Sequence, residues 1–466
     1  MAFIHENFLL NNDRAIELYH GYAADQPIID YHNHLPPAEI AQDQKYENIT
    51  QLWIAGDHYK WRAMRAHGFD EHYITGEAND KEKFMAWAST VPHTLRNPLF
   101  HWTHLELKRY FDIDEFLLPE NASRLYDQMN ERLRDERYSC RGLLKKMNVK
   151  YLCTTEDPMD DLRYHQQLEK EQLDFEVSTA FRPDKLLNIQ SEFFLDVMDD
   201  LSTGAQTSIE DFQSLCDAIR KRIDYFHQNG SRLSDHGLAY IPFADYTEAQ
   251  VKSIFLKRLE GGKLTPLEIE QFQTALLVYL GETYHEYNWV QQFHLGALRN
   301  TNSRQFKTLG PDTGWDSIGD YKQAETMAKY FDALDAGNKL TKTIIYNLNP
   351  AYNEVFATMA GNFNDGSVRG KMQYGAAWWY LDQKQGITNQ LDALSNAGLL
   401  SGFIGMLTDS RSFMSFPRHE YFRRVLADML GQEMQRGELP DDLPWIGGMF
   451  RDICYGNAKQ YFSIDE

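Results

Sequence analysis

Two histidines separated by one residue follow a short apolar run near the beginning of the chain. His32 and His34 follow residues 28–31, two isoleucines, an aspartate and a tyrosine. Alternate residues of an extended strand point to the same side, so both imidazoles can face one cavity. Two imidazoles on one side of a strand end provide half of a site for Zn²⁺ or a similar divalent ion. The alternative is an HxH pair that arises by chance on a solvated loop and binds nothing.

A carboxylate that could complete this site lies near the other end of the chain. Asp409 ends the apolar run of residues 402–408, and Arg411 follows it two positions later. In a closed barrel the first and last strands are neighbours, so Asp409 would face the same cavity as the histidines. The planar guanidinium of Arg411 suits a substrate carboxylate. Asp409 could instead be a turn residue or a helix N-cap, and Arg411 a solvated loop charge.

Polar residues also end apolar runs in the middle of the chain. His294 could be a third metal ligand, a polar contact to a substrate or a core histidine bonded to the backbone. Arg182 closes another such run and is a candidate clamp for an anion. Asp235, with His236 beside it, could supply acid and base groups or only form a turn.

Two aromatic segments could complete a binding pocket. His58 and Tyr59 lie in residues 56–62, a stretch that gathers titratable and aromatic groups into one helical turn. A helix surface with i,i+3 pairs would have the same composition. Residues 374–380 contain two tyrosines and two adjacent tryptophans, enough to line a sugar pocket, although adjacent tryptophans also suit a core.

Most of these polar residues share one position, the end of a short apolar segment. Apolar, β-branched runs alternate with amphipathic helical stretches along the chain, without an internal repeat. This alternation is typical of a parallel sheet covered by helices. It predicts a (β/α)8 barrel of the TIM type, whose chemistry lies at the carboxyl ends of the strands. We expect strands at residues 27–34, 149–155, 175–181, from 237 onward, 289–295, 343–348 and 402–409.

One connection is far too long for a simple barrel. The stretch from residue 35 to 148 exceeds an ordinary strand-to-helix loop and has the periodicity of helices. We therefore expect residues 1–34 to hold an N-terminal segment and the first strand, residues 35–148 to form a helical insertion over the barrel mouth, and residues 149–466 to form the remainder of the barrel and the C-terminal helices. The insertion helices are expected at residues 49–67, 81–90, 102–110, 123–135 and 140–147.

Composition excludes several classes of protein. The chain has 47 basic and 68 acidic residues, a net charge of −21, which argues against binding nucleic acid or an anionic membrane. Its hydrophobic share of 42% rules out a mainly disordered chain. The four cysteines form no CxxC pair, and no stretch approaches the length of a membrane span. We expect a cytoplasmic protein that acts on a small molecule.

Taken together, the motifs resemble those of the amidohydrolase superfamily and, more narrowly, of the glucuronate (uronate) isomerase family. HxH after the first strand is a generic signal, whereas the HYKWR, HLGALRN and TDSRS motifs are specific. The matching motifs extend over most of the chain, at residues 32–37, 57–62, 181–184, 234–237, 292–300, 375–379 and 408–412.

The resemblance implies a (β/α)8 barrel of the metal-dependent hydrolase kind. It implies conversion of D-glucuronate to D-fructuronate and of D-galacturonate to D-tagaturonate by proton transfer through a cis-enediol. One divalent ion, usually zinc, would be held by His32, His34 and Asp409. No lysine closes a strand in the region where two-metal relatives carry one, so a single ion is favoured.

The same resemblance suggests roles for the other residues. Asp409 is the first candidate for the base. Tyr59, with His58 beside it, is the second candidate or else the acid. Arg411 also belongs to the catalytic set. Together with Arg182 it would bind the substrate carboxylate and stabilise the negative charge that develops during the reaction. We also place His294 and Asp235 at the substrate, with His294 as an alternative metal ligand.

Two other functions use the same residues. A mononuclear metal-dependent hydrolase of the same superfamily could attack a lactone, ester or amide, and a non-catalytic sugar-binding protein would tolerate loss of the metal residues. A hydride shift is the competing route for isomerisation itself. A homo-oligomer is the common assembly for such enzymes and is expected here.

Overall fold

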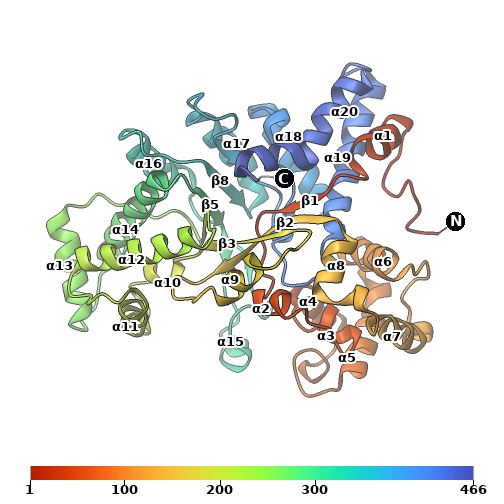
Figure 1. Cartoon of the computed structure of the whole chain (residues 1–466), viewed down its shortest axis with the longest axis horizontal. Helices are drawn as coiled ribbons and strands as arrows, with labels where there is room; N and C mark the ends of the chain where they lie inside the picture. The colour runs from red at the N-terminus through yellow and green to blue at the C-terminus, as the bar shows by residue number, and fades with distance from the viewer. Residues whose placement is uncertain (1, 465–466) are drawn as a thin grey trace.

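The core of the molecule is a curled parallel sheet at the centre of Figure 1. The computed structural model describes residues 2–464. Within them the sheet has seven strands, and every neighbouring pair is parallel. A short antiparallel pair, β6 (Ala297–Leu298) with β7 (Ser317–Ile318), lies apart from it. The order is β1 (Ile28–Asp30), β2 (Val149–Glu156), β3 (Glu176–Phe181), β4 (Leu233–Leu238), β5 (Val290–Leu295), β8 (Thr343–Asn347) and β9 (Met372–Tyr374).

The strands are buried on both faces, because helices cover the outside and side chains fill the inside. Along β2, Tyr151 and Cys153 join the inner cluster with Leu233 and Val290, whereas Leu152 joins the larger core toward the helices. Such two-sided burial explains why these strands have nearly continuous apolar sequences instead of alternating ones.

The expected strands are present within a few residues, apart from two differences. β4 begins at Leu233 rather than near residue 237, so Asp235 and His236 lie inside a buried strand and not in a turn. Residues 402–409, expected to be the last strand, form none in the described chain. Gly405 in this segment has a φ of 78°, which interrupts an extended backbone.

Seven helices lie between β1 and β2 and gather on one side of the molecule (Figure 1). The helix expected over residues 49–67 is divided in two by a short loop. Asp57, the last residue of that loop, caps the second helix by accepting hydrogen bonds from the backbone N–H groups of Tyr59 and Lys60. The helices are α2 (Pro37–Ala41), α3 (Ile49–Trp53), α4 (His58–His67), α5 (Asp80–Thr90), α6 (Pro98–Phe111), α7 (Pro119–Leu133) and α8 (Cys140–Lys146).

The remaining helices surround the sheet, and α1 (Asp13–Leu18) packs against α19 (Pro417–Arg436) near the C-terminal helices. Among residues 2–464, none of the helices combines the length and apolar character that crossing a bilayer requires. The others are α9 (Arg163–Glu169), α10 (Asp184–Leu187), α11 (Phe194–Ala205), α12 (Phe212–Gln228), α13 (Glu248–Leu259), α14 (Pro266–Glu286), α15 (Ser303–Leu309), α16 (Ala324–Asp335), α17 (Asn353–Asn362), α18 (Lys384–Ala397), α20 (Leu443–Arg451) and α21 (Asn457–Phe462).

Asp30, the last residue of β1, connects this edge strand to a segment from the far end of the chain. Its carboxylate is fully buried and accepts hydrogen bonds from the Thr408 N–H and hydroxyl, both at 2.7 Å, and from the Asn33 amide at 2.9 Å. The His419 ring nitrogen lies 3.1 Å away. Four donor groups from three segments of the chain therefore meet on one carboxylate, which fixes residues 403–408 beside β1.

Backbone hydrogen bonds continue this junction toward the carboxyl end of β1. The Asp409 N–H donates to the His32 carbonyl at 3.2 Å, and the His34 N–H donates to the Ser410 carbonyl at 2.9 Å. The junction thus places the residues after β1 directly against those after residue 408, without a regular strand there.

We predict that Asp30→Asn lowers the free energy of unfolding by about 2–4 kcal/mol, because an amide offers one acceptor oxygen and turns an N–H donor toward the donors that now surround the carboxylate. Urea denaturation followed by far-UV circular dichroism would measure the change. Asp332→Asn, an exposed change on α16, is the matched control. Equal midpoints for the two variants would contradict the role of Asp30.

Candidate active site

A cavity of about 470 Å³ opens at the carboxyl ends of the strands. This volume is within the range of small-molecule sites. Strand ends, the start of α4 and the segment after residue 408 all contribute to its wall. The candidate site residues that line it are His32, His34, His58, Tyr59, Arg182, His294, Asp409 and Arg411.

The structure brings His32, His34 and Asp409 together in the floor of this cavity. Asp409 Oδ1 lies 3.3 Å from His32 Nε2 and 3.0 Å from His34 Nε2. The Trp378 indole N–H donates to Asp409 Oδ2 at 2.5 Å. Although burial opposes it, hydrogen bonding by the two imidazoles holds the pKa of the Asp409 carboxyl well below its usual range. Asp409 is therefore a fixed carboxylate with one oxygen toward the histidines.

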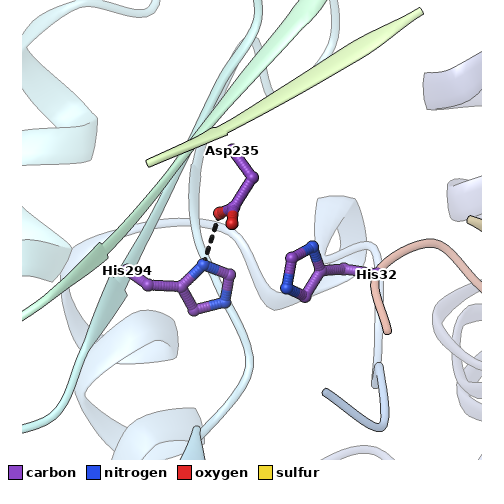
Figure 2. Close-up of side chains that lie close together, drawn as sticks. All are labelled: His32, Asp235 and His294. Atoms are coloured by element: carbon purple, nitrogen blue, oxygen red, sulfur yellow. Dashed lines mark hydrogen bonds and ion pairs between the residues drawn. The ribbon is translucent and has the colours of Figure 1, made fainter. Parts of the chain in front are cut away.

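His294 lies beside His32 and is oriented from behind by Asp235, as Figure 2 shows. His294 Nδ1 lies 2.7 Å from Asp235 Oδ1, and the two imidazole rings are 4.6 Å apart. Asp235 accepts the Nδ1 proton, so the lone pair of His294 is on Nε2. The Tyr346 ring stacks on His294 at 4.2 Å and completes its support.

Asp235 is fully buried and does not line the cavity, contrary to the direct substrate contact expected from sequence. The reason is its place within β4, below the strand end. Its second oxygen lies 3.1 Å from an Arg182 nitrogen. Burial alone would raise the pKa of the Asp235 carboxyl, but Arg182 and the imidazoles of His294 and His32 hold it well below its usual range.

Within residues 2–464, two sets of three groups could hold a divalent ion, and they share His32. His32 Nδ1 is buried without a hydrogen-bond partner, and the buried Nε2 faces Asp409 Oδ1 at 3.3 Å, a contact that an ion between the two atoms would replace. In the set with Asp235 and His294, the carboxylate is already engaged by Arg182 and by His294. The set of His32, His34 and Asp409 opens onto the cavity and provides two nitrogens and one oxygen, as open zinc sites do.

The protonation of His34 is consistent with this donor set. Burial lowers the pKa of the His34 imidazole to about 4, so the ring is neutral at pH 7 and has a lone pair available. The residues present therefore fit one divalent ion.

His58 and Tyr59 begin α4 and form the opposite wall. Their rings stack at 4.7 Å, and the Tyr59 ring also contacts Trp102 edge-on at 6.0 Å. Burial raises the pKa of the Tyr59 phenol well above its usual value, so the group is protonated at pH 7. Burial lowers the pKa of His58, so its ring is neutral. Tyr59 can thus donate a proton near neutral pH, whereas the unprotonated His58 ring is not suited to act as the acid.

The two predicted arginines occupy different environments. Arg182 is bound by Asp184 at 2.9 Å and by Asp235 at 3.1 Å, which fixes its guanidinium. Arg411 is 42% exposed and pairs with Asp312 at 3.0 Å across the mouth. Arg299, whose guanidinium lies 4.8 Å from the Trp379 ring, faces the same Asp312 at 3.4 Å.

Several cavity residues and contacts were not identified from sequence. Arg418 and Asp312 line the cavity, and Trp378 donates to Asp409. Arg418 lies in the first turn of α19, where its type and spacing match those of an ordinary amphipathic helix. Asp312 lies on a loop between glycines, which reads as a turn. Trp378 had been expected to line a pocket or a core, and no pattern indicates its hydrogen bond.

Comparison with known proteins gives one consistent family. The family model of glucuronate isomerase matches residues 1–462. A uronate isomerase of Flavobacterium johnsoniae is 58% identical over 463 residues, which cover 99% of each chain. A uronate isomerase of Bacteroides thetaiotaomicron is 50% identical over 465 residues, again with 99% of each chain covered.

Solved structures agree. A crystal structure of a uronate isomerase from Thermotoga maritima superimposes with a TM-score of 0.94 at 31% identity, covering 99% of this chain and 100% of the other. A glucuronate isomerase from Caulobacter crescentus, at 23% identity, shares the fold with a TM-score of 0.92 over 99% of this chain and 97% of the other. On a family match over nearly its whole length, this chain belongs to the glucuronate (uronate) isomerase family.

Proposed function

We propose that the chain interconverts D-glucuronate and D-fructuronate, and D-galacturonate and D-tagaturonate, in the cavity at the strand ends. The observation that carries this proposal is one cavity lined by a fixed carboxylate, a protonated phenol and several guanidinium groups, including those of Arg182 and Arg411. Family membership favours isomerisation over the lactone, ester or amide hydrolysis that the same donor set could support.

Asp409 and Tyr59 carry the proton transfers. The Asp409 carboxylate removes the proton from C2 of the open-chain aldose, while the Tyr59 phenol donates its proton to the oxygen at C1, which gives a cis-enediol. The Tyr59 phenolate then takes the proton from the oxygen at C2, and Asp409 returns its proton to C1. The double bond moves from C1–O to C2–O, and both side chains return to their starting protonation states.

One divalent ion, which we assign as Zn²⁺, would be held by His32, His34 and Asp409. When bound, it would polarise the oxygens at C1 and C2 and so make the C2 proton more acidic. His294 lies next to this set with its free Nε2 toward the cavity, where it can contact a sugar hydroxyl.

The arginines and Asp235 position the substrate. Arg182 and Arg411 bind the C6 carboxylate and the negative charge that develops at the oxygens. Asp235 does not touch the sugar but holds both His294 and Arg182, so it sets the distance between the reacting end and the carboxylate end.

The same proposal covers the architecture around the site. Residues 403–408 take the place of an eighth strand and close the sheet into a (β/α)8 barrel, held by the bonds between Asp30 and Thr408. Residues 1–34 contain the first strand, residues 35–148 form a helical insertion that covers the barrel mouth, and residues 149–466 form the remainder of the barrel and the C-terminal helices. We propose a cytoplasmic homo-oligomer that binds neither nucleic acid nor membrane.

Asp409→Asn should lower kcat by about 10³-fold, because an amide cannot accept the C2 proton. A coupled assay of D-glucuronate and D-galacturonate isomerisation would measure it, with Asp332→Asn as the control for loss of one carboxylate. A variant that keeps most of its turnover would contradict the assignment of Asp409.

Metal content tests the ion site independently of turnover. The purified protein should contain close to one equivalent of a divalent metal, and His34→Gln should retain less than about a tenth of it, because an open site with three ligands loses much of its affinity with each one. Inductively coupled plasma mass spectrometry gives the number. His285→Gln, an exposed change at the end of α14, is the control. Equal metal in both variants would overturn the proposed ligand set.

Solvent isotope incorporation distinguishes the two routes. In D₂O, fructuronate formed from D-glucuronate should carry deuterium at C1, because the proton on Asp409 exchanges with solvent between its removal and its return. Mass spectrometry and proton NMR of the product would show it. Product free of deuterium at C1, even after many turnovers, would favour a direct hydride shift from C2 to C1 and contradict the proton-transfer route.

A further inference from the structure

A buried arginine that neither the metal site nor the carboxylate clamp uses lies under Tyr59. Arg418, in the first turn of α19, is 4% exposed and lines the cavity. Its guanidinium carbon lies 5.4 Å from the centre of the Tyr59 ring and 4.2 Å from the Trp102 ring. A guanidinium at these distances from two aromatic rings is held by cation–π attraction and by contact.

The polar partners of Arg418 leave it only partly neutralised. One terminal nitrogen lies 3.6 Å from Asp382 and donates to the Thr408 carbonyl at 3.4 Å, a long hydrogen bond. Its Nε is buried without a hydrogen-bond partner. Burial raises the pKa of Asp382 to about 7, although Arg418 opposes the rise, so near neutral pH this carboxyl is ionised in only part of the molecules. The carboxylates of Asp57 and Glu106 also act on Arg418, without a direct ion pair to it. A buried cation stabilises a negative charge that forms next to it.

The charges around the Tyr59 phenol make Arg418 its main stabilising partner. Asp57 acts on it from the N-cap of α4, Asp382 from the end of the short helix at Trp379–Leu381, and Asp409 from the segment beside β1, while the His58 ring stacks on its own. All three carboxylates disfavour a negative phenolate, whereas Arg418 favours it and has the largest effect of these charged groups on Tyr59. Without Arg418, loss of the phenol proton would leave an uncompensated buried anion.

We propose that Arg418 is a positioning residue for the isomerisation, which fixes the Tyr59 ring and stabilises the phenolate left when Tyr59 gives its proton to the substrate. In that step the phenolic O–H bond breaks, the proton moves to the substrate oxygen at C1, and the negative charge remains on the Tyr59 oxygen until the proton on the C2 hydroxyl returns. The inference rests on the acid role assigned to Tyr59 under the proposed function.

A purely structural role is the competing explanation, since Arg418 also fills space against Trp102. The two explanations differ in what the charge contributes. Arg418→Met keeps most of the aliphatic part of the side chain. If packing alone matters, this variant should change the stability of the protein rather than kcat. If the charge matters, Arg418→Met should lower kcat and Arg418→Lys should restore much of it.

The test is a double-mutant cycle with Tyr59→Phe, measured as kcat and KM for D-glucuronate on metal-loaded protein. We expect Arg418→Met to lower kcat by about 30-fold with KM changed less than about threefold, and Arg418→Lys to recover at least about a third of the wild-type kcat. In the Tyr59→Phe background, Arg418→Met should change kcat by less than about twofold, because there is no phenolate left to stabilise.

Arg424→Met is the matched control. Arg424 lies in the same helix, is buried, pairs with Glu420 at 2.8 Å and has its guanidinium 4.1 Å from the Tyr19 ring, but it does not line the cavity. Its replacement should leave kcat within about twofold of wild type. Circular dichroism and metal content of every variant separate loss of folding from loss of chemistry.

The outcomes distinguish the inference from the function on which it rests. If Arg418→Met lowers kcat equally with and without the Tyr59 hydroxyl, or if Arg418→Lys is no better than Arg418→Met, the inference is wrong while the proposed function stands. If Tyr59→Phe itself keeps the wild-type kcat, the acid role of Tyr59 in the proposed function is wrong, and the role of Arg418 that rests on it is wrong too.

Discussion

The junction between β1 and residues 403–410 is the constraint on which the site depends. Asp30 binds Thr408 through two hydrogen bonds, and the Asp409 N–H binds the His32 carbonyl. Residues from opposite ends of the chain are thereby held in register, which puts the Asp409 carboxylate within 3.3 Å of both imidazoles. Buried hydrogen bonds to a carboxylate are strong and directional, so a small change at Asp30 would separate the halves of the site.

Around this junction the cavity combines charges of opposite sign at different depths. The carboxylates of Asp409 and Asp235 remain ionised because imidazoles and Arg182 surround them, while the Tyr59 phenol stays protonated because burial opposes its ionisation. Groups whose environments push their pKa values apart are what proton transfer between carbon and oxygen requires. The guanidinium of Arg411 lies at the mouth, where it is partly exposed to solvent and pairs with Asp312.

Much of this could be predicted from the sequence, because the strand ends carry the chemistry. Periodicity located most strands, and HxH with a distant Asp409 indicated the cluster of donors. The polar run around Asp235 hid the start of β4, since a buried strand with four polar or small residues has no apolar signal. The positive φ of Gly405 makes the backbone irregular where the last strand was expected. Arg418 could not be identified, because its role depends on a tertiary contact with Tyr59 that local pattern does not encode.

The proposed ion lies between His32, His34 and Asp409 rather than deeper, between His32, Asp235 and His294. Anomalous diffraction at the zinc edge from crystals of the zinc-loaded protein would locate it directly. A single anomalous peak is expected at about 2.0–2.2 Å from one ring nitrogen of His32, from one ring nitrogen of His34 and from Asp409 Oδ1. A peak on the Asp235 side of His32, or no peak near His34, would contradict it.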